Sequence, residues 1–241
     1  MNKIIMFIDK FYNNTGDKIR FSRQQASDFA KQIADDFNPL HNIEAKRFCV
    51  PGDLLFAVTL ARAGLHQQMR FKFSGMVTDE NELHFPTTLG ENVKVTDAND
   101  KEYLEISAAG DKTTNPALIE SLVKAYVGFS GHTFPHLLVE LMARENVMIN
   151  PARPMIMYES MAIDLKRLDV AEISLELAKS ELTIDGKRGN ACLTFNLLSE
   201  GEMVGHGEKH MILSGLREFD QATMDNIAND YNAMKAAYQA A

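Results

Sequence analysis

The sequence predicts an α+β fold in which the two halves of the chain repeat one order of elements. Each half opens with an amphipathic helix, continues with a helix that is apolar nearly all round, and then enters segments in which apolar and polar residues alternate. A helix without a polar face has to be covered by other structure. Alternating segments are typical of antiparallel strands that bury one face. We therefore expect each half to be a sheet wrapped around its own central helix.

The first predicted helix begins at Ser22, because Ser22 and Gln25 have the spacing of a capping box. Apolar residues then recur at helical spacing as far as Phe37. Pro39 disfavours helical geometry in the residue before it and has no backbone N–H to donate. The helix is therefore expected to end near Asp36 or Phe37.

The apolar helix of the first half is predicted at residues 54–61. Asp53 is a suitable N-cap residue for it, and Gly64 is a typical stop signal. Strand-like segments follow at residues 69–76, 93–95 and 103–106, separated by turn-forming residues. Residues 1–9 lack the features of a signal peptide and are expected to form a first strand.

The second half repeats this pattern with little identity between the residues. An amphipathic helix is expected to open at Asn115-Pro116, followed by a buried helix at residues 134–143. Strands are expected at residues 155–163, 173–184, 191–198 and 203–213, with a hairpin turn at Asp185-Gly186. Residues 219–241 have the spacing of a final surface helix.

This repetition matches the double hot-dog architecture, in which two sheet-wrapped helices pair to form one functional unit. Here both copies would lie in one chain. We expect an N-terminal half at residues 1–114, a C-terminal half at residues 115–218 and the closing helix at 219–241. A functional pocket would then lie where the two halves meet.

Charge and cysteine content argue against several classes of protein. The chain has 241 residues and a formal net charge of −8, without the basic stripe typical of nucleic-acid-binding proteins. No apolar segment approaches the length of a membrane span. Cys49 and Cys192 are too few and too far apart for a disulfide framework or a cysteine-based zinc site, which favours a reducing cytoplasm.

The segment with the clearest chemical potential is Asp36-Phe37-Asn38-Pro39-Leu40-His41. Five residues separate its two titratable groups, which would not share a face of a continuous helix. The Asn-Pro break lets the chain turn, so that Asp36 and His41 can reach one pocket and hold a water molecule between them. One group would then take a proton from the water while the other positions it. The simpler alternative is an ordinary turn with a histidine bonded to the backbone.

This segment resembles the signature of the MaoC-like, (R)-specific enoyl-CoA hydratases of the hot-dog superfamily: Asp, any residue, then Asn-Pro-Ile/Leu-His after a short helix. The resemblance covers about residues 17–65 and includes Gly52. It implies that Asp36 and His41 activate water, that Asn38 shapes the loop, and that the Gly52 N–H receives the thioester oxygen. The implied partner is a trans-2-enoyl thioester of coenzyme A or acyl carrier protein, without a cofactor or metal. Association of two chains into a homodimer is also open.

Three departures from the signature leave a second hypothesis open. Asp35 replaces the usual glycine, Asp53 stands where the family tends to have an apolar residue, and the second half has no copy of the Asp/His pair. If Asp53 caps the helix, its carboxyl group turns away from the site. The alternative function is a non-catalytic module that binds an acyl thioester or a protein, or a thioesterase-like relative.

Two further histidines fall on one face of a predicted strand. His206 and His210 have even spacing within residues 203–213. A metal site would need further ligands of the right kind beside them, so ordinary polar roles at the surface or in the core are favoured for both.

Overall fold

The computed structural model describes residues 6–240. Its strands form one ten-stranded antiparallel sheet in the order β1-β2-β4-β5-β6-β3-β8-β11-β10-β9, and β7 pairs with β12 in a separate ribbon. The strands of the first half are β1 (Asn13–Thr15), β2 (Lys18–Arg20), β3 (Leu65–Phe73), β4 (Leu83–His84), β5 (Val93–Thr96) and β6 (Glu102–Thr113). Those of the second half are β7 (Val147–Met148), β8 (Ile156–Leu165), β9 (Ser174–Asp185), β10 (Arg188–Ser199), β11 (Glu202–Ser214) and β12 (Arg217–Glu218).

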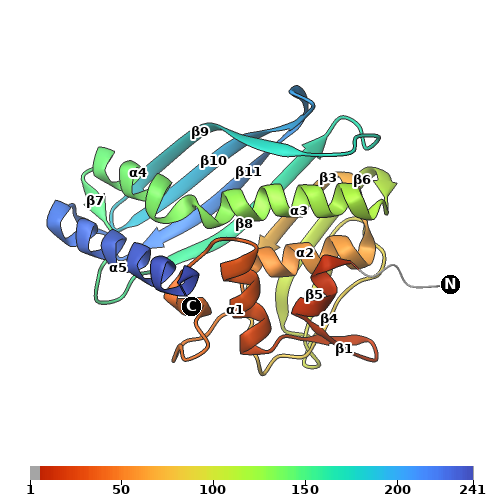
Figure 1. Ribbon diagram of the computed structural model, residues 1–241, viewed down its shortest axis with the longest axis horizontal. Coiled ribbons are helices and arrows are strands. Elements are labelled where there is room, and N and C mark those ends of the chain that lie inside the picture. Colours follow the sequence, from red (N-terminus) through yellow and green to blue (C-terminus); the bar gives the residue numbers. More distant parts are fainter. Residues whose placement is uncertain (1–5, 241) are drawn as a thin grey trace.

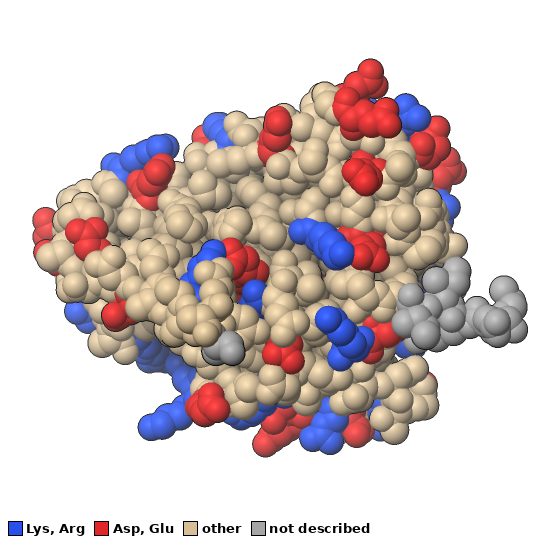
Figure 2. All heavy atoms as spheres, in the orientation of Figure 1, with Lys and Arg blue, Asp and Glu red and all other residues tan. Residues whose placement is uncertain are grey.

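The helices lie on one face of this curved sheet, as Figure 1 shows. They are η1 (Phe7–Phe11), α1 (Arg23–Gln32), η2 (Pro39–His41), α2 (Gly52–Ala63), α3 (Pro116–Gly131), the π-helical segment η3 (Thr133–Leu137), α4 (Leu138–Arg144) and α5 (Gln221–Gln239). No helix among residues 6–240 is long and apolar enough to cross a bilayer. On the face drawn in Figure 2, positive and negative side chains are interspersed and neither sign forms an extended patch.

The strand order confirms the double hot-dog fold and its internal repetition. The two half-sheets join where β3 pairs with β8, in the register Phe71 opposite Met161. Outward from this seam the first half runs β3-β6-β5-β4 and the second half runs β8-β11-β10-β9. In both halves the first long strand is central, the last strand of the repeat lies beside it, and the middle strands lie further out. The same connectivity has therefore been used twice.

The central helices α2 and α3 bring the two halves into one core. Phe56 of α2 is fully buried and meets Phe71 and Tyr126 edge to face, each at a ring-centroid distance of 5.1 Å. Tyr126, on α3, continues the contact to Phe195 of β10 at 5.7 Å. Each such aromatic pair contributes about 0.5–1.5 kcal/mol beyond the area it buries. The prediction of an apolar, wrapped helix after residue 51 is confirmed.

Several sequence predictions need correction. Residues 7–11 form η1 and not a strand, while residues 1–5 lie outside the described part of the chain. β3 ends at Phe73, so Gly75 and Met76 are not in a strand. In the second half the long buried helix is the first one, α3, and the second, α4, has only seven residues. The amphipathic spacing of α3 is correct, since its apolar residues Leu118, Leu122 and Tyr126 are fully buried while Lys124 is exposed.

Other predicted elements are confirmed. Ser22 caps α1 in a reciprocal capping box with Gln25. β9 and β10 form the expected hairpin, with Asp185 opposite Arg188 and Gly186 at a φ of +56°. The closing helix is α5, which lies at one side of the molecule below α4 and has its C-terminal end next to α1 (Figure 1).

Candidate functional site

The chain leaves helical geometry before Asp36, earlier than predicted. α1 ends at Gln32, and Asp35 adopts a left-handed φ of +52° that turns the following residues away from the helix axis. The Asp36 carboxylate then accepts a hydrogen bond from the N–H of Asn38 at 2.8 Å, and Asn38 accepts one from the N–H of Leu40 at 3.1 Å. Two consecutive side-chain-to-backbone turns of this kind fix the loop.

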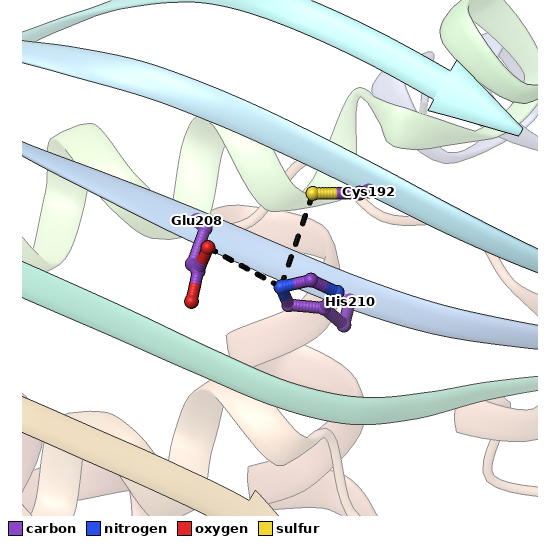
Figure 3. Close-up of side chains that lie close together, drawn as sticks. All are labelled: Cys192, Glu208 and His210. Atoms are coloured by element: carbon purple, nitrogen blue, oxygen red, sulfur yellow. Dashed lines mark hydrogen bonds and ion pairs between the residues drawn. The ribbon is translucent and has the colours of Figure 1, made fainter.

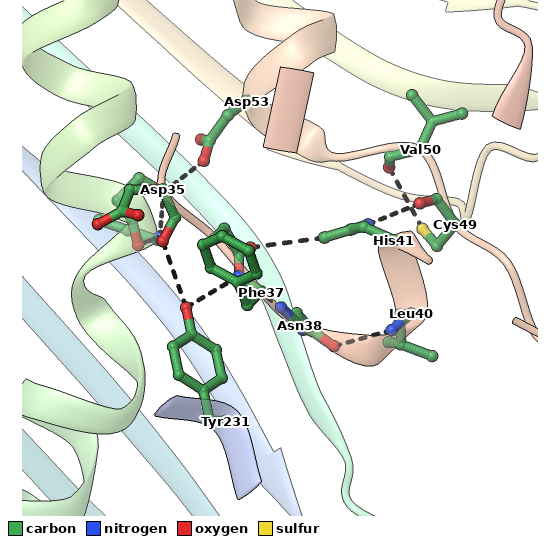
Figure 4. A network of polar contacts seen from close by, with 12 residues as sticks. Asp35, Phe37, Asn38, Leu40, His41, Cys49, Val50, Asp53 and Tyr231 are labelled. Atoms are coloured by element: carbon green, nitrogen blue, oxygen red, sulfur yellow. Dashed lines mark hydrogen bonds and ion pairs between the residues drawn. The ribbon is translucent and has the colours of Figure 1, made fainter. Parts of the chain in front are cut away.

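Asp36 and His41 face each other across this turn. His41 Nδ1 lies 2.7 Å from the Cys49 carbonyl oxygen, which can only accept, so Nδ1 carries the proton (Figure 4). The other ring nitrogen, His41 Nε2, lies 3.6 Å from Asp36 Oδ2. A water about 2.8 Å from both atoms would form ordinary hydrogen bonds with each. The backbone bond expected of an ordinary turn is thus present, and it leaves the second nitrogen available.

Asp36 lines a cavity of about 320 Å³ between the two halves and α5. Asn38 is also at its wall, whereas His41 and Gly52 are not among the lining residues. His41 is 9% exposed, and it contacts Asp36, which lies at the wall. Apolar and proline side chains form much of the remaining wall: Pro39, Leu40, Phe134, Leu138, Ile149, Pro151, Pro154, Ile156, Met211 and Ile227. Such a cavity suits a ligand with an apolar chain and a few polar atoms.

A second cluster of polar side chains, formed by Asp53, Ser130 and Lys209, lies at the same cavity. Asp53 was predicted to cap α2, but Pro51 occupies the N-cap position and the Asp53 side chain points inward. Its Oδ2 accepts a hydrogen bond from Ser130 Oγ at 2.5 Å, and Lys209 Nζ donates to the same Ser130 oxygen. Ser130 and Lys209 both line the cavity. α2, the end of α3 and the inner face of β11 thus each contribute one side chain.

Burial favours the neutral forms of both charged groups in this trio. It raises the pKa of the Asp53 carboxyl group, opposed by Lys209 and Ser130, and it lowers the pKa of Lys209, opposed by Asp53 and Asp36. Asp53 Oδ1 is buried without a hydrogen-bond partner among residues 6–240. A polar cluster that is strongly desolvated and only partly satisfied is typical of functional sites.

Gly52 begins α2, where backbone N–H groups have no partner within the helix. It is packed closely against two rings, because a Cβ atom at this position would lie 3.0 Å from Tyr158 and 3.1 Å from Phe73. Tyr158 lines the cavity, and the Lys209 ammonium lies 4.6 Å from the centre of its ring. The ring of Tyr158 therefore separates Gly52 from the open part of the cavity.

Gly131 holds the Asp36 loop against the end of α3. A Cβ atom there would lie 1.7 Å from the Ala34 carbonyl oxygen and 3.4 Å from the Asp36 Cβ. The end of α3 and the backbone just before Asp36 are thus in direct contact, and only glycine permits that approach.

We expect Gly131→Ala to lower the free energy of unfolding by about 1–3 kcal/mol or more, the usual cost of overpacking. The loop before Asp36 must move to admit the methyl group. Urea unfolding measures the loss, and Gly128→Ala is the matched control, because a Cβ at Gly128 meets no atom within 4 Å. Equal stability of the two variants would contradict this packing.

Helix α5 closes the site from the side of the motif. Tyr231 Oη accepts a hydrogen bond from the Phe37 N–H at 2.9 Å, and Lys235 forms an ion pair with Asp35. His132 Nε2 lies 2.8 Å from the same Asp35 carboxylate. Partial burial raises the pKa of Asp35, but the hydrogen bonds from Lys235 and His132 outweigh it, so the pKa is lowered on balance. Asp35 is therefore held by its own partners, outside the Asp36–His41 contact.

Tyr231→Phe is expected to lower the free energy of unfolding by about 1–3 kcal/mol, since it leaves the buried Phe37 N–H without an acceptor. Tyr238→Phe on the same helix is the control, because Tyr238 is 37% exposed and water can replace its hydroxyl group. Chemical denaturation of both variants tests this difference. A Tyr238→Phe variant that loses as much stability as Tyr231→Phe would show that the Phe37 contact is unimportant.

The sequence reasoning placed Asp36, Asn38 and His41 together, and it missed Ser130, Lys209 and Tyr231. Lys209 occupies an inward position in the alternation of β11, between the outward residues Glu208 and His210. A lysine at an apolar position of a strand is the signal that was available. Nothing comparable marked Ser130, which lies between Phe129 and Gly131 at the end of α3.

Comparisons with known proteins give a family and remote structural similarities. Solved structures that match include the acyl-CoA thioesterase II TesB2 from Mycobacterium marinum, with 10% identity, a TM-score of 0.43, and coverage of 88% of this chain and 99% of that one. A putative thioesterase II from Thermobifida fusca YX matches with 11% identity, a TM-score of 0.45, and coverage of 88% and 100%. A search of curated proteins gives no significant match. The family model described as "Protein of unknown function (DUF3581)" matches residues 6–222, and this chain belongs to that family.

Proposed function

We propose that this protein binds an acyl thioester and adds water to it, with Asp36 and His41 activating the water. The observation that carries the proposal is the 3.6 Å contact between Asp36 Oδ2 and His41 Nε2 at the wall of a largely apolar cavity. An apolar chain would occupy the cavity, and the reacting carbon atoms would lie beside Asp36. The carrier of the acyl group is coenzyme A or acyl carrier protein.

The first candidate reaction is hydration of a trans-2-enoyl thioester, as the resemblance to MaoC-like hydratases implies. His41 Nε2 accepts a proton from the water while the water oxygen adds to the β carbon. His41 then returns that proton to the α carbon. Negative charge develops on the thioester oxygen during the addition. Lys209 and Ser130 line the cavity and are suited to stabilise that charge, whereas the Gly52 N–H lies behind the Tyr158 ring.

The second candidate is a thioesterase-like reaction, in which the same water attacks the carbonyl carbon and releases the thiol. Lys209 and Ser130, which line the cavity, are equally suited to stabilise the oxyanion of this attack. Binding without turnover is the third outcome. The burial of His41, which does not line the cavity, and the ring of Tyr158 over Gly52 favour it.

One assay separates these three outcomes. The protein is incubated with a trans-2-enoyl-CoA and with the saturated acyl-CoA of equal length, and both the enoyl absorbance and free thiol are followed. Loss of absorbance without thiol release indicates hydration, while thiol release from the saturated thioester indicates hydrolysis. The thiols of Cys49 and Cys192 are subtracted with a sample lacking substrate. Asp36→Asn should abolish either activity. Turnover that survives Asp36→Asn would refute the proposed role of Asp36 and His41. Binding of the thioester without turnover would indicate a non-catalytic acyl-thioester-binding module.

A further inference from the structure

Three side chains of types that commonly ligate transition metals lie close together on the outer face of the sheet, away from the cavity. Cys192 is on β10, and Glu208 and His210 are on β11 (Figure 3). Cys192 is directly opposite His210 in the strand pairing, and Glu208 is two residues before His210. Because side chains two residues apart share a face and paired residues are neighbours, the strand register brings all three together.

The ligand atoms have separations that suit one tetrahedral ion. Cys192 Sγ lies 3.8 Å from His210 Nε2, and His210 Nε2 lies 3.4 Å from a Glu208 carboxylate oxygen. All three atoms lie within 4.8 Å of one another. Around zinc, with bonds of about 2.3 Å to sulfur and about 2.0–2.1 Å to nitrogen or oxygen, tetrahedral angles separate the ligand atoms by roughly 3.3–3.6 Å. Small side-chain rotations would therefore bring the three ligand atoms to bonding distance from one ion.

We propose that Cys192, Glu208 and His210 bind a single Zn²⁺ ion, with water in the fourth position. A thiolate and an imidazole select zinc-like ions over Mg²⁺ and Ca²⁺, which prefer all-oxygen ligands. The thiolate and carboxylate together carry the two negative charges that neutralise the ion. No CxxC spacing marks this site, because its ligands come from two paired strands. The even spacing of His206 and His210 placed both on one face of a strand, and the fold brings Cys192 and Glu208 beside His210.

Further charged side chains lie near the site. Glu181 and Lys179 of β9 are close to Cys192, and Arg70 of β3 lies 3.7 Å from the second Glu208 oxygen. Partial burial, Glu208 and Glu181 raise the pKa of the Cys192 thiol, while Lys179 lowers it.

Cobalt is the direct probe, because Co²⁺ bound tetrahedrally to a thiolate has a sulfur-to-metal charge-transfer band and intense visible bands. We expect the full-length protein to take up one Co²⁺ per chain with these bands, and Zn²⁺ to displace it. Cys192→Ser and His210→Ala should abolish the charge-transfer band. Glu208→Gln should weaken binding by at least about tenfold, since even the groups that support ligands contribute that much.

The chain offers matched controls for both key ligands. Cys49→Ser removes the other thiol, whose pKa is raised to about 11 by burial, and should leave the spectrum unchanged. His206→Ala removes a histidine four residues away on the same strand and should also have no effect. A Zn²⁺-induced rise in Tm that is absent in Cys192→Ser checks that the ion binds the folded protein. The proposal is overturned if the band is absent, or if it persists in Cys192→Ser and is lost in Cys49→Ser.

Discussion

Replacing His41 by alanine is expected to lower the turnover of an acyl thioester by about 10²–10⁴-fold, the usual contribution of a positioned acid or base. The variant removes the one ring nitrogen that faces Asp36 Oδ2, while the cavity wall keeps its shape because His41 does not line it. The loss should therefore fall on kcat, with KM nearly unchanged. Steady-state kinetics on whichever thioester the wild-type protein turns over measure both constants.

His41→Asn separates proton transfer from loop structure. Its amide N–H can still donate to the Cys49 carbonyl oxygen, as His41 Nδ1 does at 2.7 Å, but it offers no basic nitrogen to Asp36. We expect a Tm close to that of the wild-type protein together with the same loss of turnover as in His41→Ala. Full activity in His41→Asn would mean that the imidazole only supports the loop.

The parts of the site that sequence reasoning reached are those held by local interactions. Ser22 and Gln25 start α1, and Asp36 and Asn38 fold back onto the next backbone N–H groups, all within four residues along the chain. Residue type and spacing define such contacts completely. The contact between Asp36 and His41 followed from the same turn, so it was foreseen before the fold was known.

The parts that were missed depend on contacts between distant segments. Asp53 is a good N-cap residue by type, yet its carboxyl group turns inward. There it accepts a hydrogen bond from Ser130, 77 residues away in the sequence, and Ser130 is in turn bonded to Lys209. The contact of Tyr231 with Phe37 spans 194 residues. Local propensity cannot weigh such partners, because they are brought close only when the two half-sheets join and α5 docks.

The trio of Asp53, Ser130 and Lys209 gives the largest stability prediction. Lys209→Met is expected to lower the free energy of unfolding by about 3–5 kcal/mol at neutral pH, because it leaves a buried carboxyl group without its cation. Methionine keeps the length and apolar stem of lysine, so little packing is lost. Urea unfolding of the variant and the wild-type protein measures the difference.

The pH dependence of that loss tests its electrostatic cause. In Lys209→Met the opposing cation is gone, so the folded-state pKa of Asp53 is raised further above the ordinary value of 3.8. A carboxyl group with a raised folded pKa contributes its stability below the unfolded pKa and loses it as pH rises through the folded pKa. The difference in the free energy of unfolding between Lys209→Met and the wild-type protein should thus be small at about pH 4, near the ordinary carboxyl pKa. It should widen toward neutral pH.

The double variant Asp53→Leu/Lys209→Met completes the argument. Removing both charges replaces a desolvated pair by apolar side chains, which is often neutral or stabilising. We expect it to be more stable than Lys209→Met alone, with a coupling energy in the double-mutant cycle of the size typical for residues in one polar network. If the protein keeps Asp53 and Lys209 at a cost in stability, the double variant should be well folded and should have lost ligand binding at the cavity. A double variant less stable than either single variant would instead show that the pair is there to hold the fold together.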